Sequence, residues 1–190
     1  MKIQIFLLLF LCLTLIPFAD AETIWANTVV AYYGTNAGSG ISNILGAPNG
    51  TLTDVGTADG AIWNNYVTVS FGSVFYDGPG YDLEVYVHDL DTSEDFYVYI
   101  SQNNINWYQV GFTSTGTENI FPSGGAYKYD MAISGLSSAY YVKIVTNEQD
   151  AAYYSPDMDA VGVYFIPEPC TVMLAIIGFL FFATKFRIKK

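Results

Sequence analysis

The chain has little of what most catalytic and zinc-binding sites require. Its 190 residues contain one histidine, His88, and two cysteines, Cys12 and Cys170. A structural or catalytic zinc site needs several histidine or cysteine ligands, and a Ser–His–Asp triad would depend on His88 alone. The sequence contains nothing that resembles a nucleophile elbow. It also lacks a phosphate-binding loop, because no lysine follows the glycine-rich segment 34–40. We therefore expect no enzymatic activity.

Basic residues are also scarce between residues 22 and 166. Lys128 and Lys143 are the only two in this segment, against sixteen acidic residues, so its net charge is −14. Such a charge repels nucleic acid and anionic lipid and attracts divalent cations. Both cysteines lie outside the segment. Its stability must then come from a hydrophobic core, with a bound metal as the only other expected contribution.

The N-terminus has the features of an export signal. Lys2 is followed by an almost unbroken apolar run, residues 3–18, and then by Ala19-Asp20-Ala21. A positive start, an apolar stretch and small residues at the exit are typical of a secretory signal peptide. We predict a signal peptide at residues 1–21, removed by signal peptidase before Glu22. Residues 22–166, called the body from here on, are long enough for one sizeable core.

The C-terminus contains a short motif, an apolar run and a basic tail. Pro167-Glu168-Pro169 precedes a predicted transmembrane helix at about 170–184 and a basic tail at 185–190. An apolar helix of about 14 residues covers roughly 21 Å, so it spans a bilayer core of about 30 Å only marginally. The basic residues would lie at the cytoplasmic edge.

This order closely resembles the PEP-CTERM sorting signal of exported bacterial proteins. The resemblance implies recognition by an exosortase and cleavage near Pro167-Glu168-Pro169. It also implies an inner-membrane intermediate, followed by release of the body to the cell surface or an extracellular polymer matrix. The alternative is a plain C-terminal membrane anchor.

The body is predicted to consist of strands separated by turns. Its short runs are rich in β-branched and aromatic residues, and no long stretch shows a helical period. Leu83, Val85 and Val87 should face inward, with Glu84 and Tyr86 outward. Eight strands are expected, at residues 28–33, 66–71, 83–87, 96–100, 107–112, 127–133, 140–145 and 160–165. They predict one all-β domain, an antiparallel β-sandwich, with a jelly roll favoured over an immunoglobulin-like arrangement.

Sixteen tyrosines are many for this length, and all of them lie in the body. Several alternate with aliphatic residues, so they are expected on the outer faces of the sheets. Tyrosine fills a half-exposed β-sheet face well, which is the simpler explanation. The functional alternative is a platform on which sugar rings stack.

Two acidic loops are candidate metal sites. Asp77 and Asp82 bracket a Gly-Pro-Gly turn, and Asp157 and Asp159 precede the last predicted strand, where they point the same way if extended. Oxygen ligands on a glycine-containing loop suit Ca²⁺. Turn formation explains these aspartates too, and for the Asp-Gly-Pro-Gly turn by itself it is the favoured explanation. A third acidic segment, 89–95, lacks the glycine and the distant glutamate of a calcium loop and is interpreted as a solvated hairpin loop.

Five motifs follow one another along the body. They are Gly46–Gly50, Asp77–Gly80, Val98–Trp107, Tyr140–Ile144 and Asp157–Val161. Their order is similar to that of bacterial cell-surface β-sandwiches of the discoidin, or galactose-binding-like, type. Members of that family have an Arg-Tyr-Val-Arg-Ile-like strand, which here keeps only Lys143, and an Asp-Gly in the polar turn before Trp, which here is missing. The resemblance implies a jelly-roll binding module with structural Ca²⁺ at Asp77, Asp82, Asp157 and Asp159, and with carbohydrate affinity.

Three functions are compatible with these features. The favoured one is an exported, non-catalytic cell-surface or matrix protein that binds polysaccharide and has a structural calcium. The second is a purely structural matrix or coat component without a specific ligand. The third is a secreted glycan-cleaving enzyme that uses a pair of carboxylates.

Overall fold

The structure, a computed structural model, describes residues 22–34, 40–55, 65–89, 94–113, 125–148 and 156–165. The predicted signal peptide (1–21) and the predicted sorting signal (167–190) lie outside the described residues. Within the described ranges, no helix is long and apolar enough to cross a membrane.

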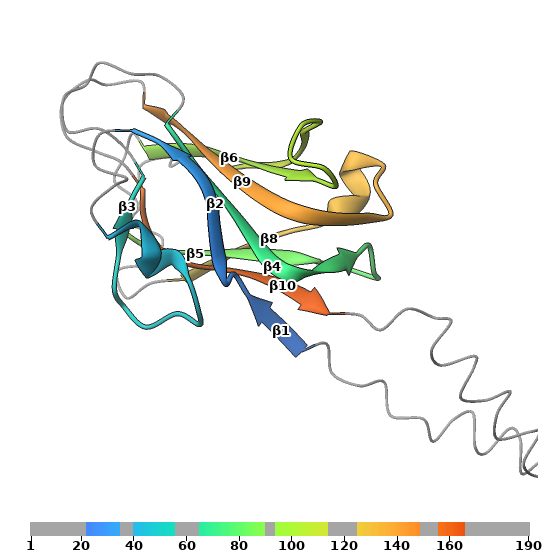
Figure 1. The fold of residues 1–190 in the computed structure, drawn as a ribbon, viewed down its shortest axis with the longest axis horizontal. Coiled ribbons are helices and arrows are strands. Elements are labelled where there is room, and N and C mark those ends of the chain that lie inside the picture. The colour runs from blue at the N-terminus through green and yellow to red at the C-terminus, as the bar shows by residue number, and fades with distance from the viewer. Residues whose placement is uncertain are drawn as a thin grey trace, which may run out of the picture.

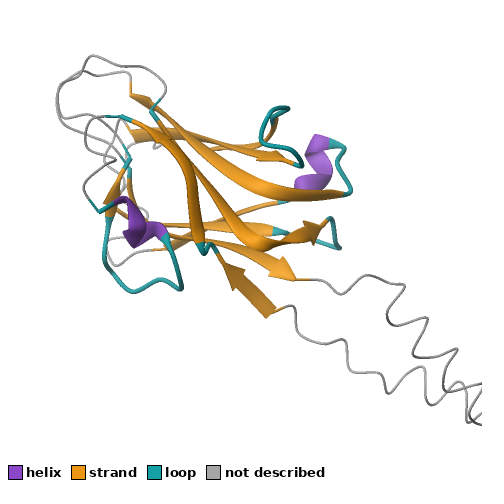
Figure 2. Ribbon diagram, in the orientation of Figure 1, coloured by secondary structure: helices purple, strands orange, loops and turns teal. Residues whose placement is uncertain are grey.

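The described part of the chain is built almost entirely of strands, as Figure 2 shows. Two short 3₁₀ helices, η1 and η2, interrupt them. The elements are β1 (Glu22–Trp25), β2 (Thr28–Tyr33), η1 (Ile41–Ile44), β3 (Thr53–Asp54), β4 (Tyr66–Tyr76), β5 (Leu83–Asp89), β6 (Glu94–Ser101), β7 (Tyr108–Thr113), β8 (Gly125–Tyr129), η2 (Met131–Ser134), β9 (Ser138–Glu148) and β10 (Asp157–Phe165).

The strands form two five-stranded sheets that face each other (Figure 1). Sheet A has the order β1-β10-β5-β8, with β3 also paired to β10. Sheet B has the order β2-β4-β9-β6-β7. Every strand pair is antiparallel. The prediction of an all-β antiparallel sandwich is therefore confirmed.

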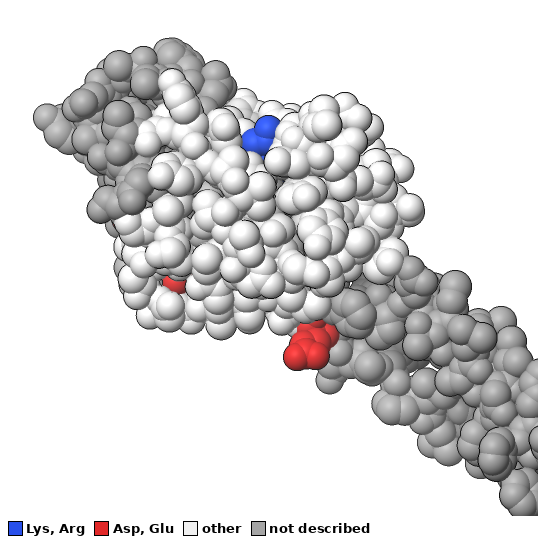
Figure 3. All heavy atoms as spheres, viewed as in Figure 1, with Lys and Arg blue, Asp and Glu red and all other residues white. Residues whose placement is uncertain are grey.

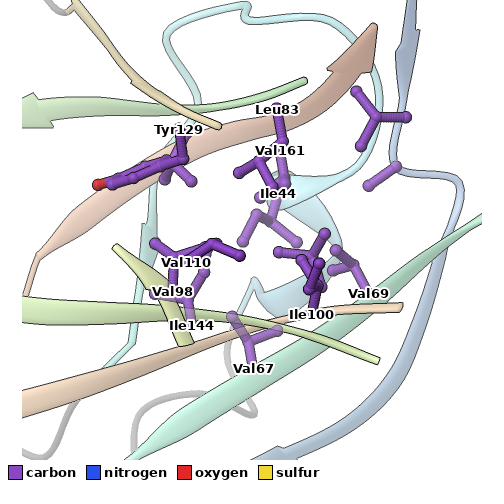
Figure 4. Close-up of a cluster of buried hydrophobic side chains, with 14 of the residues drawn as sticks. Ile44, Val67, Val69, Leu83, Val98, Ile100, Val110, Tyr129, Ile144 and Val161 are labelled. Carbon is purple, nitrogen blue, oxygen red and sulfur yellow. The ribbon is translucent and has the colours of Figure 1, made fainter. Parts of the chain in front are cut away.

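The core lies between the sheets and follows the predicted alternation. Leu83 and Val161 of sheet A and Val67, Val98 and Ile144 of sheet B are at most 1% exposed and converge in Figure 4. Fully burying one such side chain stabilises a protein by about 1.5–3 kcal/mol. The described core draws on both sheets of the body.

The predicted strand at 127–133 is partly wrong. Strand β8 ends at Tyr129, and the chain then turns into η2. Asp130 starts this turn, because its side chain accepts a hydrogen bond of 2.8 Å from the backbone N–H of Ala132. Gly135, at φ 74°, ends it in the left-handed conformation that glycine adopts without strain. The apolar Met131 is buried by η2, which is why its segment resembled a strand.

Strands β1 and β3 were not predicted from the sequence. They have four and two residues, too few to show alternation, and both form by pairing with β10. The other eight strands are all present near their expected positions, several with longer bounds.

Candidate functional site

An acidic cluster lies where β5 begins and β8 ends. Pairing of Leu83 with Tyr129 places Asp82, just before β5, beside Asp130, just after β8. Asp77 follows β4, and its backbone N–H bonds to the carbonyl of Ser137. One carboxylate oxygen from each of Asp77, Asp82 and Asp130 lies within 4.8 Å of the other two. The structure thus brings the predicted Asp77 and Asp82 together and adds Asp130, which the sequence analysis missed.

Asp82 is the buried member of this cluster and is fully inaccessible to solvent. Its Oδ1 accepts a hydrogen bond from Gly78 N–H and its Oδ2 one from Met131 N–H, both at 2.8 Å. Burial raises the pKa of Asp82 above its usual value despite these two bonds, and the neighbouring Asp77 and Asp130 raise it further. A divalent cation would relieve this repulsion, and carboxylate oxygens are the ligands that Ca²⁺ prefers. The residues present therefore fit a calcium ion.

Asp159 lies elsewhere, on β10. Its carboxylate accepts hydrogen bonds from Asn49 N–H at 3.0 and 3.1 Å and from Gly50 N–H at 3.0 Å. These bonds tie the loop before β3 to the sheet across more than a hundred residues of sequence. Asp157, two residues earlier, is paired in register with Asp54 of β3 and Asp89 of β5.

The two predicted aspartate pairs do not share one site. Asp82 immediately precedes Leu83, which pairs with Val163 of β10. Asp159 lies four residues from Val163, about 13 Å along the strand. Ligand oxygens of one Ca²⁺ lie within about 5 Å of each other. Calcium binding at either position stays a prediction, and the register places Asp159 well along β10 from the position of Asp82.

The outer face of sheet B carries a continuous row of large side chains. Tyr33, Tyr66, Val145, Tyr97 and Phe112 are register partners on β2, β4, β9, β6 and β7, so the row crosses the whole sheet. The rings of Tyr33 and Tyr66 are stacked at 6.2 Å, and those of Tyr97 and Phe112 at 4.6 Å. Tyr33 and Phe112 are 49% and 45% exposed. We call this row, with the adjacent Tyr99 and Trp107, the aromatic face.

Lys143 is the cation of the aromatic face. It lies on β9 in the next outward row, opposite Thr68 and Tyr99. Its Nζ is 3.9 Å from the ring centroid of Trp107 and 5.6 Å from that of Tyr66. Burial among these side chains lowers the pKa of Lys143. Such a cation is attracted by the ring faces and has lost part of its hydration.

A polar turn places Trp107 over this lysine. Asn104 has a left-handed backbone (φ 60°), and the Asn103 side chain accepts hydrogen bonds from the N–H groups of Ile105 and Asn106 at 3.0 and 2.9 Å. These bonds hold the shape of the turn without an Asp-Gly pair. Strand β7 begins at Tyr108, so Trp107 belongs to the turn rather than to the strand predicted at 107–112.

The outer face of sheet A is different, because its polar groups are already paired. Tyr164 donates a hydrogen bond of 2.6 Å to Glu84. Lys128 lies over the Tyr164 ring at 5.6 Å, and Trp25 meets Tyr86 edge-on at 5.7 Å. Glu84, predicted to point outward, lies on this face but is only 4% exposed.

Charge is sparse on one side of the molecule. In the view of Figure 3, the described surface is almost entirely uncharged, with one small basic patch and a few acidic atoms.

Comparisons with known proteins reveal similarity in structure but not in sequence. No protein-family model and no curated protein matches the chain. A candidate chitobiase fragment from Bacteroides thetaiotaomicron superposes with a TM-score of 0.50 at 13% identity, over 79% of this chain and 98% of that one.

Two carbohydrate-binding modules of family 32 are also similar. The one from Streptococcus pneumoniae EndoD has a TM-score of 0.49 at 13% identity and covers 76% of this chain and 100% of its own. That of AlyQ, solved in complex with 4,5-unsaturated mannuronic acid, has a TM-score of 0.47 at 14% identity and covers 78% and 98%. At these identities the likeness concerns the fold alone. The body has the two-layer antiparallel β-sandwich fold of the Bacteroides thetaiotaomicron chitobiase fragment.

Proposed function

We propose that this protein is an exported, non-catalytic cell-surface or matrix protein whose sandwich binds polysaccharide. The observation that supports binding is the aromatic face, where Tyr33, Tyr66, Tyr97 and Phe112 lie in one row on four strands, with Val145 of the fifth strand between Tyr66 and Tyr97. The C–H faces of sugar rings pack on aromatic rings, and a row of such rings suits an extended chain of sugars better than a single sugar.

Exposure of the row distinguishes it from core packing. Tyr33 and Phe112, at its two ends, are about half exposed, while Val67, Ile144 and Val98 on the opposite side of the same strands are fully buried. These aromatic rings are exposed and do not form part of the core, so they are available to contact a ligand. A purely structural coat component remains the alternative if no polysaccharide binds.

Export and processing complete the proposal. The signal peptide at 1–21, its removal by signal peptidase, and exosortase processing near Pro167-Glu168-Pro169 rest on the sequence patterns described above. The proposed structural Ca²⁺ is assigned to Asp77, Asp82 and Asp130, because these three carboxylates approach one another. The ion would join the ends of β4, β5 and β8 and would have no part in contacting sugar.

Binding of the full chain and of the 22–166 body to a panel of soluble polysaccharides, measured by affinity electrophoresis and calorimetry, tests the proposal. The double variant Tyr97→Ala/Phe112→Ala should weaken binding about tenfold or more, since it removes two stacked rings. Tyr86→Ala, an aromatic truncation on the outer face of sheet A, is the matched control and should leave binding unchanged.

Thermal melting of each variant separates loss of binding from loss of folding. No binding by the folded wild-type protein to any polymer of the panel would refute the polysaccharide function and favour the structural coat component. Equal losses in the double variant and in Tyr86→Ala would refute the aromatic face as the binding surface.

A further inference from the structure

The two basic residues of the body lie on opposite outer faces of the sandwich and have different surroundings. Lys128, on β8 in sheet A, is a register partner of Glu84, and the Tyr164 hydroxyl and the Glu84 carboxylate raise its pKa. Lys143, on β9 in sheet B, contacts the rings of Trp107 and Tyr66 instead. The contacts that the structure shows for its ammonium group, within the described residues, are with these two ring faces.

A partly desolvated ammonium held against ring faces can still bind an anionic group of a ligand. Burial already lowers the pKa of Lys143, which means that its surroundings favour the neutral form over the charged one. Asp95, the acidic residue that precedes Tyr97 on the outward side of β6, lies about 13 Å along the strand from Tyr99, the register partner of Lys143. On the described part of β6, Asp95 is therefore too far along the strand to compete for Lys143 with an anionic group of a ligand.

Lys143 lies near the middle of the aromatic row. It is two residues from Val145, the β9 member of the row, which is about 7 Å along the strand. A sugar ring stacked on Tyr97 and Phe112, or on Tyr66, would then hold its substituents within reach of the lysine side chain. A carboxylate substituent would accept a charge-assisted hydrogen bond from Nζ.

We infer that the aromatic face selects polysaccharides whose sugar rings carry carboxylate groups, and that Lys143 is the residue that determines this preference. This inference rests on the proposed function, because it assigns the ligand class of the same surface. The aromatic rings supply stacking that any sugar ring can use, and Lys143 distinguishes acidic from neutral sugars. The −14 charge of the body opposes the approach of a polyanion, so short-range contact with Lys143 has to provide the preference.

The test compares polymers that differ only in the carboxylate. Polygalacturonate and alginate are each measured beside their carboxyl-reduced, neutral counterparts, with the full chain and the 22–166 body at physiological ionic strength. The wild-type protein should bind an acidic polymer about tenfold more tightly than its neutral partner. Lys143→Met should remove that difference by weakening only acidic binding, and Lys143→Arg should retain it.

Lys128→Met is the matched control, since it removes the other lysine of the body and should change neither affinity. Equal binding of acidic and neutral polymers by the wild-type protein would overturn the inference and leave the proposed function intact. A preference that persists in Lys143→Met would overturn the role of Lys143. If the wild-type protein melts cooperatively, and is therefore folded, but binds none of the four polymers, the inference is refuted. Binding to the wider panel of polysaccharides then tests the proposed function separately.

Discussion

The hydroxyl groups of Tyr129 and Thr113 lie 2.6 Å apart inside the sandwich and join its two sheets. Tyr129 ends β8 in sheet A, and Thr113 ends β7 in sheet B. Both side chains are at least nine-tenths buried, so neither hydroxyl has ready access to water. A buried polar group without a partner is costly, which makes this bond a specific link between the two layers.

Replacing Tyr129 with phenylalanine should lower the free energy of unfolding by about 1–3 kcal/mol, because the Thr113 hydroxyl then stays buried without a partner. Urea unfolding followed by fluorescence measures the difference. Tyr108→Phe, which removes a hydroxyl from a 41% exposed side chain of β7, is the control and should cost much less. Equal costs in the two variants would mean that the inter-sheet bond contributes nothing.

The same tyrosine should make the protein sensitive to alkaline pH. Burial raises the pKa of Tyr129 above its ordinary value of 10.0. A raised pKa in the folded state means that the contribution to stability is complete below pH 10 and is lost as the pH rises above it. The melting temperature should fall more steeply above pH 10 in the wild-type protein than in Tyr129→Phe. Parallel curves would contradict the assignment to Tyr129.

Gly111 should not tolerate a side chain. A Cβ at this position of β7 would overlap the ring of Tyr129. Gly111→Ala is therefore expected to destabilise the protein by about 1–3 kcal/mol through overpacking. A double-mutant cycle with Tyr129→Ala checks the cause, since the alanine at position 111 should cost little once the ring is gone. An unchanged cost in that background would rule out the ring as its source.

Asp159 should stabilise the fold without calcium. Asp159→Ala removes the acceptor for the Asn49 and Gly50 N–H groups and should cost about 2–3 kcal/mol, since hydrogen bonds to charged groups are the stronger ones. The cost should be the same with Ca²⁺ and with chelator. Asp77→Asn, at an exposed carboxylate, is the comparison and should cost little in chelator.

Calcium should act at the other end of sheet A. Added CaCl₂ should raise the melting temperature of the full chain and of the body by several degrees, and Asp77→Asn or Asp130→Asn should abolish the rise. Asp159→Ala should retain it. Because burial raises the pKa of Asp82, protonation of Asp82 should weaken the effect at a higher pH than protonation of an ordinary aspartate would. A melting temperature unaffected by both Ca²⁺ and chelator would mean that Asp77, Asp82 and Asp130 do not bind calcium and serve only to form the turns.

The sequence predicted the strands because local pattern and burial coincide. Val67, Val69 and Phe71 alternate along β4, and all three are buried, as their spacing requires when one side of a strand faces a core. The pattern failed where a capping residue redirected the chain, as at Asp130, and where strands were too short to show a period, as in β1 and β3. Hydrophobic alternation identifies a strand but not its neighbour.

By itself, then, the sequence determined the all-β class, the inward face of each main strand and the acidity of the body. Only the tertiary structure decided which residues meet. Sheet register placed Tyr33, Tyr97 and Phe112 in one row, although they are far apart in the chain. Register also placed Asp130 beside Asp82 and moved Asp159 to the opposite end of β10. Which strands pair, and in which register, depends on contacts between residues that are far apart in the sequence. A local hydrophobic pattern therefore does not specify the pairing.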